Sequence, residues 1–131
     1  MSKSVMTLEL AQEEVNKWIE YKKLDEDEIE EKEAQIKTLV TAMKNGRLVL
    51  DKDFNLIQTL KFPLAKITEL KYAARIDVDS VAMKVGLIDS SNLVLLMTAY
   101  ASASCGVTTG VIGKLDTADN KIAQAIGTFF L

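Results

Sequence analysis

Residues 48–60 read LVLDKDFNLIQTL and hold the clearest structural signal of the chain, two apolar runs around a polar segment. The runs, residues 48–50 and 56–60, have the composition of strands, and the segment between them is rich in turn formers. This pattern predicts a β-hairpin with a five-residue loop. Pro63 lacks the backbone N–H that a ladder needs, so we expect the second strand to end there. Residues 67–72 alternate again and predict a third strand.

The residues before this sheet predict two helices that form a hairpin. Apolar residues recur along the first helix at the spacing of one helical face: Leu8, Ala11, Val15, Trp18 and Ile19. The second helix begins at a strong start signal, because Asp25 is a good N-cap and Glu28 completes a capping-box pattern. Residues 44–46, Lys-Asn-Gly, form a C-terminal stop with a cation followed by a left-handed cap.

The residues after the sheet return to a helical pattern and are more apolar. Asp77 or Asp79 caps a short helix that stops near Gly86. Asp89-Ser90-Ser91 then precedes a second helix over residues 92–104, which is apolar on most of its sides. An all-apolar helix is typically buried, either within its own chain or in an oligomer.

Two further start signals predict the last helices. Thr108-Thr109 begins a short helix that runs through Lys114, and Leu115, Asp116 and Asp119 repeat a staple-and-cap signature. The apolar face of the final helix consists of Ile122, Ala125, Ile126, Phe129 and Phe130. The order of elements is therefore helices, a small sheet and helices again.

Charge divides the chain into the same three segments. Residues 1–46 carry a net charge of −4, residues 47–75 carry +3, and residues 76–131 carry −2. No linker rich in Gly, Ser or Pro separates them. We therefore expect one domain over residues 1–131 with an α+β, mostly helical fold. Its parts are an acidic N-terminal helical hairpin, a small antiparallel β-sheet and a C-terminal helical region.

The composition excludes several kinds of chemistry. Without any histidine, the nucleophile–histidine pairs of many hydrolases are impossible. The single cysteine, Cys105, excludes an internal disulfide and a thiolate zinc site. No acidic cluster has a recognisable set of metal-ligand spacings, so we assign no catalytic residue, cofactor or metal. No apolar run is long enough to cross a membrane, and we expect a protein of a reducing cytoplasm.

Aromatic side chains near both ends of the chain are the candidate contact residues: Trp18, Tyr21, Phe129 and Phe130. They are either anchors of the core or contacts to another chain, because aromatics are enriched at both kinds of site.

A basic band crosses the predicted sheet and consists of Arg47, Lys52, Lys61, Lys66, Lys71 and Arg75. It is either a solvent-exposed face or a docking surface for an acidic segment. Without a basic helix or an aromatic stacking motif, nucleic acid is not an expected partner.

Two parts of the chain resemble a known family. The first is Leu60-Lys61-Phe62-Pro63-Leu64 followed by Thr68-Glu69-Leu70-Lys71-Tyr72 and Arg75, which has an apolar-x-x-Pro-apolar strand before a Glu-Leu-basic-aromatic strand. The second is the ending Lys114-Leu115-Asp116-Thr117-Ala118-Asp119, with Ile126 and Phe129-Phe130 after it. In this order they resemble the tail assembly chaperones of long-tailed bacteriophages and prophages. The resemblance covers roughly residues 47–131, and the acidic helical pair at 1–46 lies outside it.

The resemblance implies a non-enzymatic protein that binds the tape measure protein before the tail tube polymerises around it. The tail tube protein is a further candidate partner. It also implies self-association into a homo-oligomer, action in the host bacterial cytoplasm and absence from the mature virion. Two other classes stay open. One is another oligomeric phage structural component of the neck, tube or baseplate, and the other is a small helical regulator.

Overall fold

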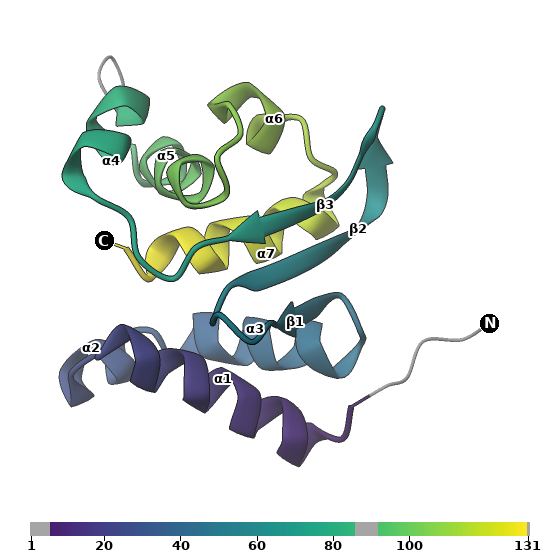
Figure 1. Ribbon diagram of the computed structural model, residues 1–131, viewed down its shortest axis with the longest axis vertical. Coiled ribbons are helices and arrows are strands. Elements are labelled where there is room, and N and C mark those ends of the chain that lie inside the picture. Colours follow the sequence, from purple (N-terminus) through teal and green to yellow (C-terminus); the bar gives the residue numbers. More distant parts are fainter. Residues whose placement is uncertain (1–5, 86–91, 131) are drawn as a thin grey trace.

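The computed structural model describes residues 6–85 and 92–130 and confirms the expected α+β, mostly helical fold. Figure 1 shows α1–α3 gathered at one end of the molecule and α4–α6 at the other, with the sheet and α7 between them. The elements in chain order are α1 (Leu8–Lys22), α2 (Glu26–Glu31), α3 (Glu33–Lys44), β1 (Leu48–Leu50), β2 (Leu56–Leu64), β3 (Ile67–Tyr72), α4 (Val78–Val85), α5 (Leu93–Cys105), α6 (Thr109–Gly113) and α7 (Thr117–Thr128). The predicted stop at Gly86 and cap at Asp89-Ser90-Ser91 lie outside the described residues.

The hairpin expected from residues 48–60 is present as the antiparallel pair β1–β2. Its loop is organised by Asp51, whose Oδ1 accepts hydrogen bonds from the backbone N–H groups of Asp53 and Asn55, both at 2.9 Å. Phe54 takes a left-handed φ of 64° within the same loop. β2 is the central strand, because β3 pairs with its other edge, also antiparallel.

Pro63 does not end β2, so this expectation was wrong. Between the pairs Thr59–Glu69 and Leu64–Ile67 the register shifts, and four residues of β2 face a single residue of β3. Pro63 lies in this bulge, where the N–H that proline lacks is not needed by the ladder. The strand therefore continues to Leu64.

The carboxylate of Asp119, on α7, binds the bulge of β2. Its Oδ1 accepts a hydrogen bond from the backbone N–H of Lys61 (2.8 Å), and its Oδ2 accepts one from that of Phe62 (2.9 Å). Asp119 is only 1% exposed. Asp119 therefore does not cap α7 as predicted, because its carboxylate accepts hydrogen bonds from the backbone of β2 instead. Asp116 caps α7, and its side chain accepts from the N–H of Ala118 at 3.0 Å.

Buried hydrogen bonds continue from α7 into the sheet through Gln58. The Gln58 side chain donates from Nε2 to the carbonyl of Asp119 (2.9 Å) and accepts at Oε1 from the Tyr72 hydroxyl (2.7 Å). Both Gln58 and Tyr72 are fully buried. Burial raises the pKa of Tyr72 well above its ordinary value, so its hydroxyl keeps the proton that it donates. These bonds tie α7 to both β2 and β3.

The N-terminal helices follow the predicted boundaries with one difference. The helix predicted from Asp25 is interrupted at Lys32, whose φ of −106° and ψ of 18° separate α2 from α3. Nothing in the local sequence explains this break. The start signal is confirmed, since the Glu28 side chain accepts from the backbone N–H of Asp25 at 3.3 Å. The stop is also confirmed, because Gly46 follows α3 with a φ of 74°.

The C-terminal helices begin at polar side chains that accept from the first turn. Asp77 accepts from the N–H of Ser80 at 2.7 Å, and the α5 cap is Asn92, which accepts from Leu95 at 3.2 Å. Thr108 caps α6 as expected. α5 packs on α7 at Gly127, where an added Cβ would collide with the backbone carbonyl of Met97. One apolar core draws residues from all three segments of the chain.

Replacing Asp119 tests the junction between α7 and β2. We expect Asp119→Ala to lower the free energy of unfolding by about 3 kcal/mol, because it leaves two N–H groups of the bulge without an acceptor. Asp116→Ala, which removes only an exposed helix cap, is the control and is expected to cost about 1 kcal/mol. Urea denaturation measures both. Equal losses for the two variants would contradict this account of Asp119.

Two glycine replacements test the contact between α5 and α7. Gly127→Ala is expected to destabilise the protein by about 2 kcal/mol, because the new methyl group meets a backbone carbonyl that cannot yield easily. Gly110→Ala is the matched control, since its Cβ meets only Thr108 Oγ1 at an ordinary 3.7 Å. It is expected to be neutral or to stabilise α6 by about 0.5 kcal/mol. Thermal melts followed by circular dichroism distinguish the two, and a neutral Gly127→Ala would argue against close packing.

Candidate functional site

The two halves of α5 have different surroundings. Its second half is buried, with Ala99 and Ala101 inaccessible to solvent. Its first turn projects three apolar side chains, since Leu93, Val94 and Leu95 are exposed by 61%, 60% and 43%. The sequence predicts this mostly apolar helix to be buried within its own chain or in an oligomer, and a single chain buries only half of it. The remaining apolar turn is available to another molecule.

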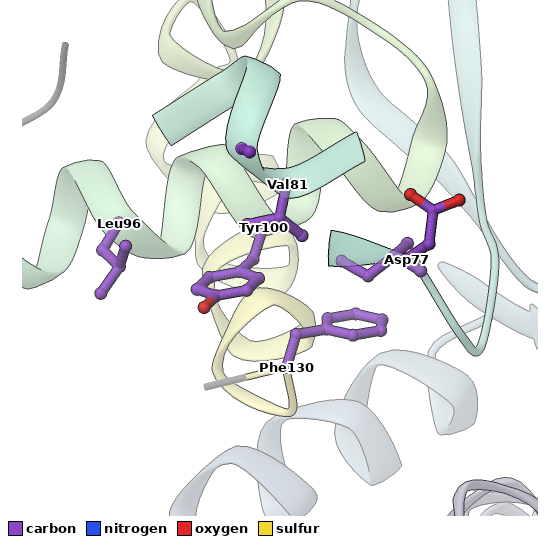
Figure 2. A pocket seen from close by; sticks show the side chains of 7 residues that line it. Asp77, Val81, Leu96, Tyr100 and Phe130 are labelled. Atoms are coloured by element: carbon purple, nitrogen blue, oxygen red, sulfur yellow. The ribbon is translucent and has the colours of Figure 1, made fainter. Parts of the chain in front are cut away.

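A pocket of about 400 Å³ opens between α4, α5 and the end of the chain, on the side of α5 that carries Leu96 and Tyr100. Val94 and Leu95 line a different hollow, of about 450 Å³, against α6 and α7. The lining of the first pocket consists of Ile76, Asp77, Val81, Ala82, Leu96, Tyr100 and Phe130. Figure 2 shows the aromatic rings of Tyr100 and Phe130 on its walls, with the Asp77 carboxylate turned away from them. Such a mostly apolar pocket can receive an apolar side chain or a small apolar ligand.

Trp18 and Phe129 are core residues, which corrects their predicted role as contacts to another chain. Trp18 is 1% exposed and Phe129 is 4% exposed. Their rings meet edge to face, with centroids 5.0 Å apart and planes at 80°. This contact joins α1 to the end of α7 and leaves neither ring free for a partner.

Tyr21 is 36% exposed and is not among the residues that line the pocket. Its ring stacks on Phe54 of the hairpin loop, with centroids 4.3 Å apart. Arg75 donates to the carbonyl of Tyr21 at 2.6 Å, and its guanidinium carbon lies 4.6 Å from the Tyr21 ring centroid. The residue therefore attaches α1 to the sheet while keeping part of its surface accessible.

Phe130 is the predicted contact residue that lines the pocket, and Lys22 packs against it. The ammonium of Lys22 lies 3.8 Å from the Phe130 ring centroid and donates to the carbonyl of Ala74 at 2.7 Å. Burial, with a smaller contribution from the nearby Arg75, lowers the pKa of Lys22 to about 8. The cation thus holds one wall of the pocket in place.

From the sequence, the apolar helix over residues 92–104 is expected to be buried in its own chain or in an oligomer. The sequence does not single out Leu93, Val94, Leu95 and Tyr100 individually as contact residues, because which sides of this helix the core covers depends on how the other helices pack.

Within residues 6–85 and 92–130, no three acidic or cysteine side chains gather closely enough to hold a metal ion. No helix in the same ranges is long and apolar enough to cross a membrane. Comparisons with protein-family models, with curated proteins and with solved structures give no match for this chain.

The lowered pKa of Lys22 makes stability depend on pH. Its folded pKa of about 8 lies below the ordinary value of 10.5, so burying the charged form opposes folding below about pH 8. This opposition is lost as the pH rises from about 8 towards 10.5, because the unfolded chain then binds more protons than the folded one. We expect the free energy of unfolding of the wild type, relative to Lys22→Met, to increase over this range.

Urea denaturation at several pH values between about 7.5 and 9.5 measures this difference over the window in which Lys22 titrates. Lys44→Met, which removes an exposed lysine of α3, is the control for loss of a charge. If the wild type and Lys22→Met had parallel pH profiles, Lys22 would not be the titrating group.

Proposed function

We propose that this protein is a tail assembly chaperone of a long-tailed bacteriophage or prophage. It binds the tape measure protein in the host bacterial cytoplasm, catalyses no reaction and is not retained in the mature virion. The observation that carries the proposal is that α5 leaves the apolar side chains Leu93–Leu95 exposed and also borders the pocket formed by Leu96, Tyr100 and Phe130. A chaperone must cover apolar segments of a partner reversibly, and a helix that offers both an apolar turn and an open pocket suits this task.

The two parts of the chain that resemble the family also come together in space, which supports the resemblance. Residues 60–64 lie on β2, residues 68–72 lie on β3, and the ending continues into α7. Asp119 joins the ending to β2 through the backbone of Lys61 and Phe62. The residues that resemble the family therefore build one continuous unit, on which α5 is packed.

The proposed mode of binding is a helix of the tape measure protein lying across the start of α5. Apolar side chains three and four positions apart on that helix cover Leu93 and Leu96, and one of them enters the pocket next to Phe130. Because the apolar turn on this chain is short, each contact is weak on its own. Weak contacts repeated along a long partner allow several copies to bind and later to leave.

Co-expression with the tape measure protein of the same genome tests the proposal. The complex is separated by size-exclusion chromatography, and light scattering gives its mass. We expect co-elution with several copies of this chain. Replacing Leu93, Val94 and Leu95 with serine is expected to weaken binding at least tenfold, which corresponds to about 1.4 kcal/mol or more.

The matched control replaces Leu8 and Leu10 on α1, two apolar residues of similar exposure, with serine. It is expected to leave binding unchanged. A stable closed ring of this chain alone that ignores the tape measure protein would overturn the proposal and favour a permanent structural component. A monomer without affinity for the tape measure protein would overturn it in favour of a regulator.

A further inference from the structure

A groove separate from the apolar turn of α5 runs between α3 and α7, which pack against each other. In Figure 1, α7 lies in the middle of the molecule and α3 below it. It is made of three hollows of about 230, 360 and 330 Å³. Adjoining hollows share lining residues, because Lys121 lines the first two and Arg47 lines the last two. The groove therefore follows α3, whose 12 residues span about 18 Å, or roughly three helical turns.

Small side chains form much of the groove. They include Ala34, Thr38, Thr41 and Ala42 from α3 and Ala118 and Ala125 from the end of the chain. Longer side chains such as Lys37, Lys121 and Ile122 line the same hollows, so the backbone of another helix can approach closely only over the small ones.

Basic side chains stand around the groove without acidic partners. Lys37, Arg47, Lys61 and Lys121 line its hollows, and the ion pairs found among the described residues are Lys17–Glu14 and Lys71–Asp51. The acidic side chain among the residues that line it is Asp119, and both of its oxygens already accept from the backbone of β2. The groove thus carries positive charge that the monomer does not neutralise.

Two buried acceptors lie at one end of the groove. The side-chain oxygens of Gln35 and Gln124 are inaccessible and accept no hydrogen bond from the described residues, and both residues line the same hollow. Buried acceptors of this kind usually have a donor. Both oxygens are inaccessible from the groove, so a bound helix reaches neither of them without a change of the glutamine rotamers.

We propose that the groove between α3 and α7 binds an acidic amphipathic helix of a partner protein. Its small residues lie against Ala34 and Ala42, and its Asp and Glu side chains pair with Lys37, Arg47 and Lys121. This surface shares none of the apolar turn of α5, so the inference does not depend on the proposed chaperone function.

The lining of the groove favours a helix over a nucleic acid. Single-stranded nucleic acids are bound by basic grooves with aromatic rings on which the bases stack. None of the described residues that line these three hollows is aromatic.

The test uses a fluorescein-labelled synthetic helix of about 18 residues, longer than the roughly 12 that match the groove. It carries alanine and serine on one face and glutamate on both flanks. Fluorescence polarisation with the full chain measures its binding. We expect Lys37→Glu combined with Lys121→Glu to weaken binding of this acidic peptide at least tenfold. A second peptide, with lysine in place of glutamate, is expected to bind the double variant and not the wild type.

The matched control is Lys52→Glu combined with Lys66→Glu, which changes the charge equally at exposed sites outside the groove. It is expected to change binding less than about twofold, as rim charges distant from a site do. Serine at Leu93, Val94 and Leu95 is expected to leave peptide binding intact, which separates this test from that of the chaperone.

Three results would overturn the inference. The first is equal weakening by the two charge-reversed pairs, which would mean unspecific attraction. The second is tighter binding of single-stranded DNA of the same charge. The third is concentration-dependent association of the protein with itself that Lys37→Glu and Lys121→Glu abolish, which would make a second copy the occupant.

Discussion

A buried carboxylate needs hydrogen-bond donors, and in this protein that requirement fixes how the last helix meets the sheet. Asp119 is removed from water and accepts from two N–H groups that are left unpaired with β3 where β2 bulges. The neighbouring Gln58 adds a second connection to the same helix. Once α7 is held there, α3 packs on one part of it and α5 meets it at Gly127. The groove and the pocket both follow from this placement of α7.

The local parts of the fold were predictable because their causes are local. The hairpin depends on turn formers between two apolar runs, and the helix starts depend on side chains such as Asp25 and Thr108 that bond to the next turn. The bulge at Pro63 was not predictable, because the acceptor that stabilises it lies 57 to 58 residues away in sequence. The roles of Trp18 and Phe129 were open for the same reason, since their contact joins distant ends of the chain.

The candidate sites were predictable only in part. The apolar run at the start of α5 indicates that this helix is covered by its own chain or by another molecule. Which half of α5 its own chain leaves exposed depends on how α7 packs. Phe130 was singled out from its position, whereas its neighbour Lys22 could be paired with it only in three dimensions. The positive groove combines Arg47 and Lys61 of the predicted basic band with Lys37 and Lys121 of two helices. No sequence pattern within α3 or within α7 shows that these basic side chains lie around one groove.

The placement of Asp119 also bears on the order in which the chain folds during translation. The ribosome makes β2 before α7. The N–H groups of Lys61 and Phe62 therefore have no Asp119 carboxylate to bind until nearly 60 further residues have been added. Contacts so distant in sequence form slowly, because closing a long loop costs conformational entropy before the contact contributes any stability. The N-terminal helices and the hairpin rely on nearer contacts and can assemble first. Because β1, β2 and β3 pair with their neighbours in sequence, the sheet can form while the core around α7 is still open.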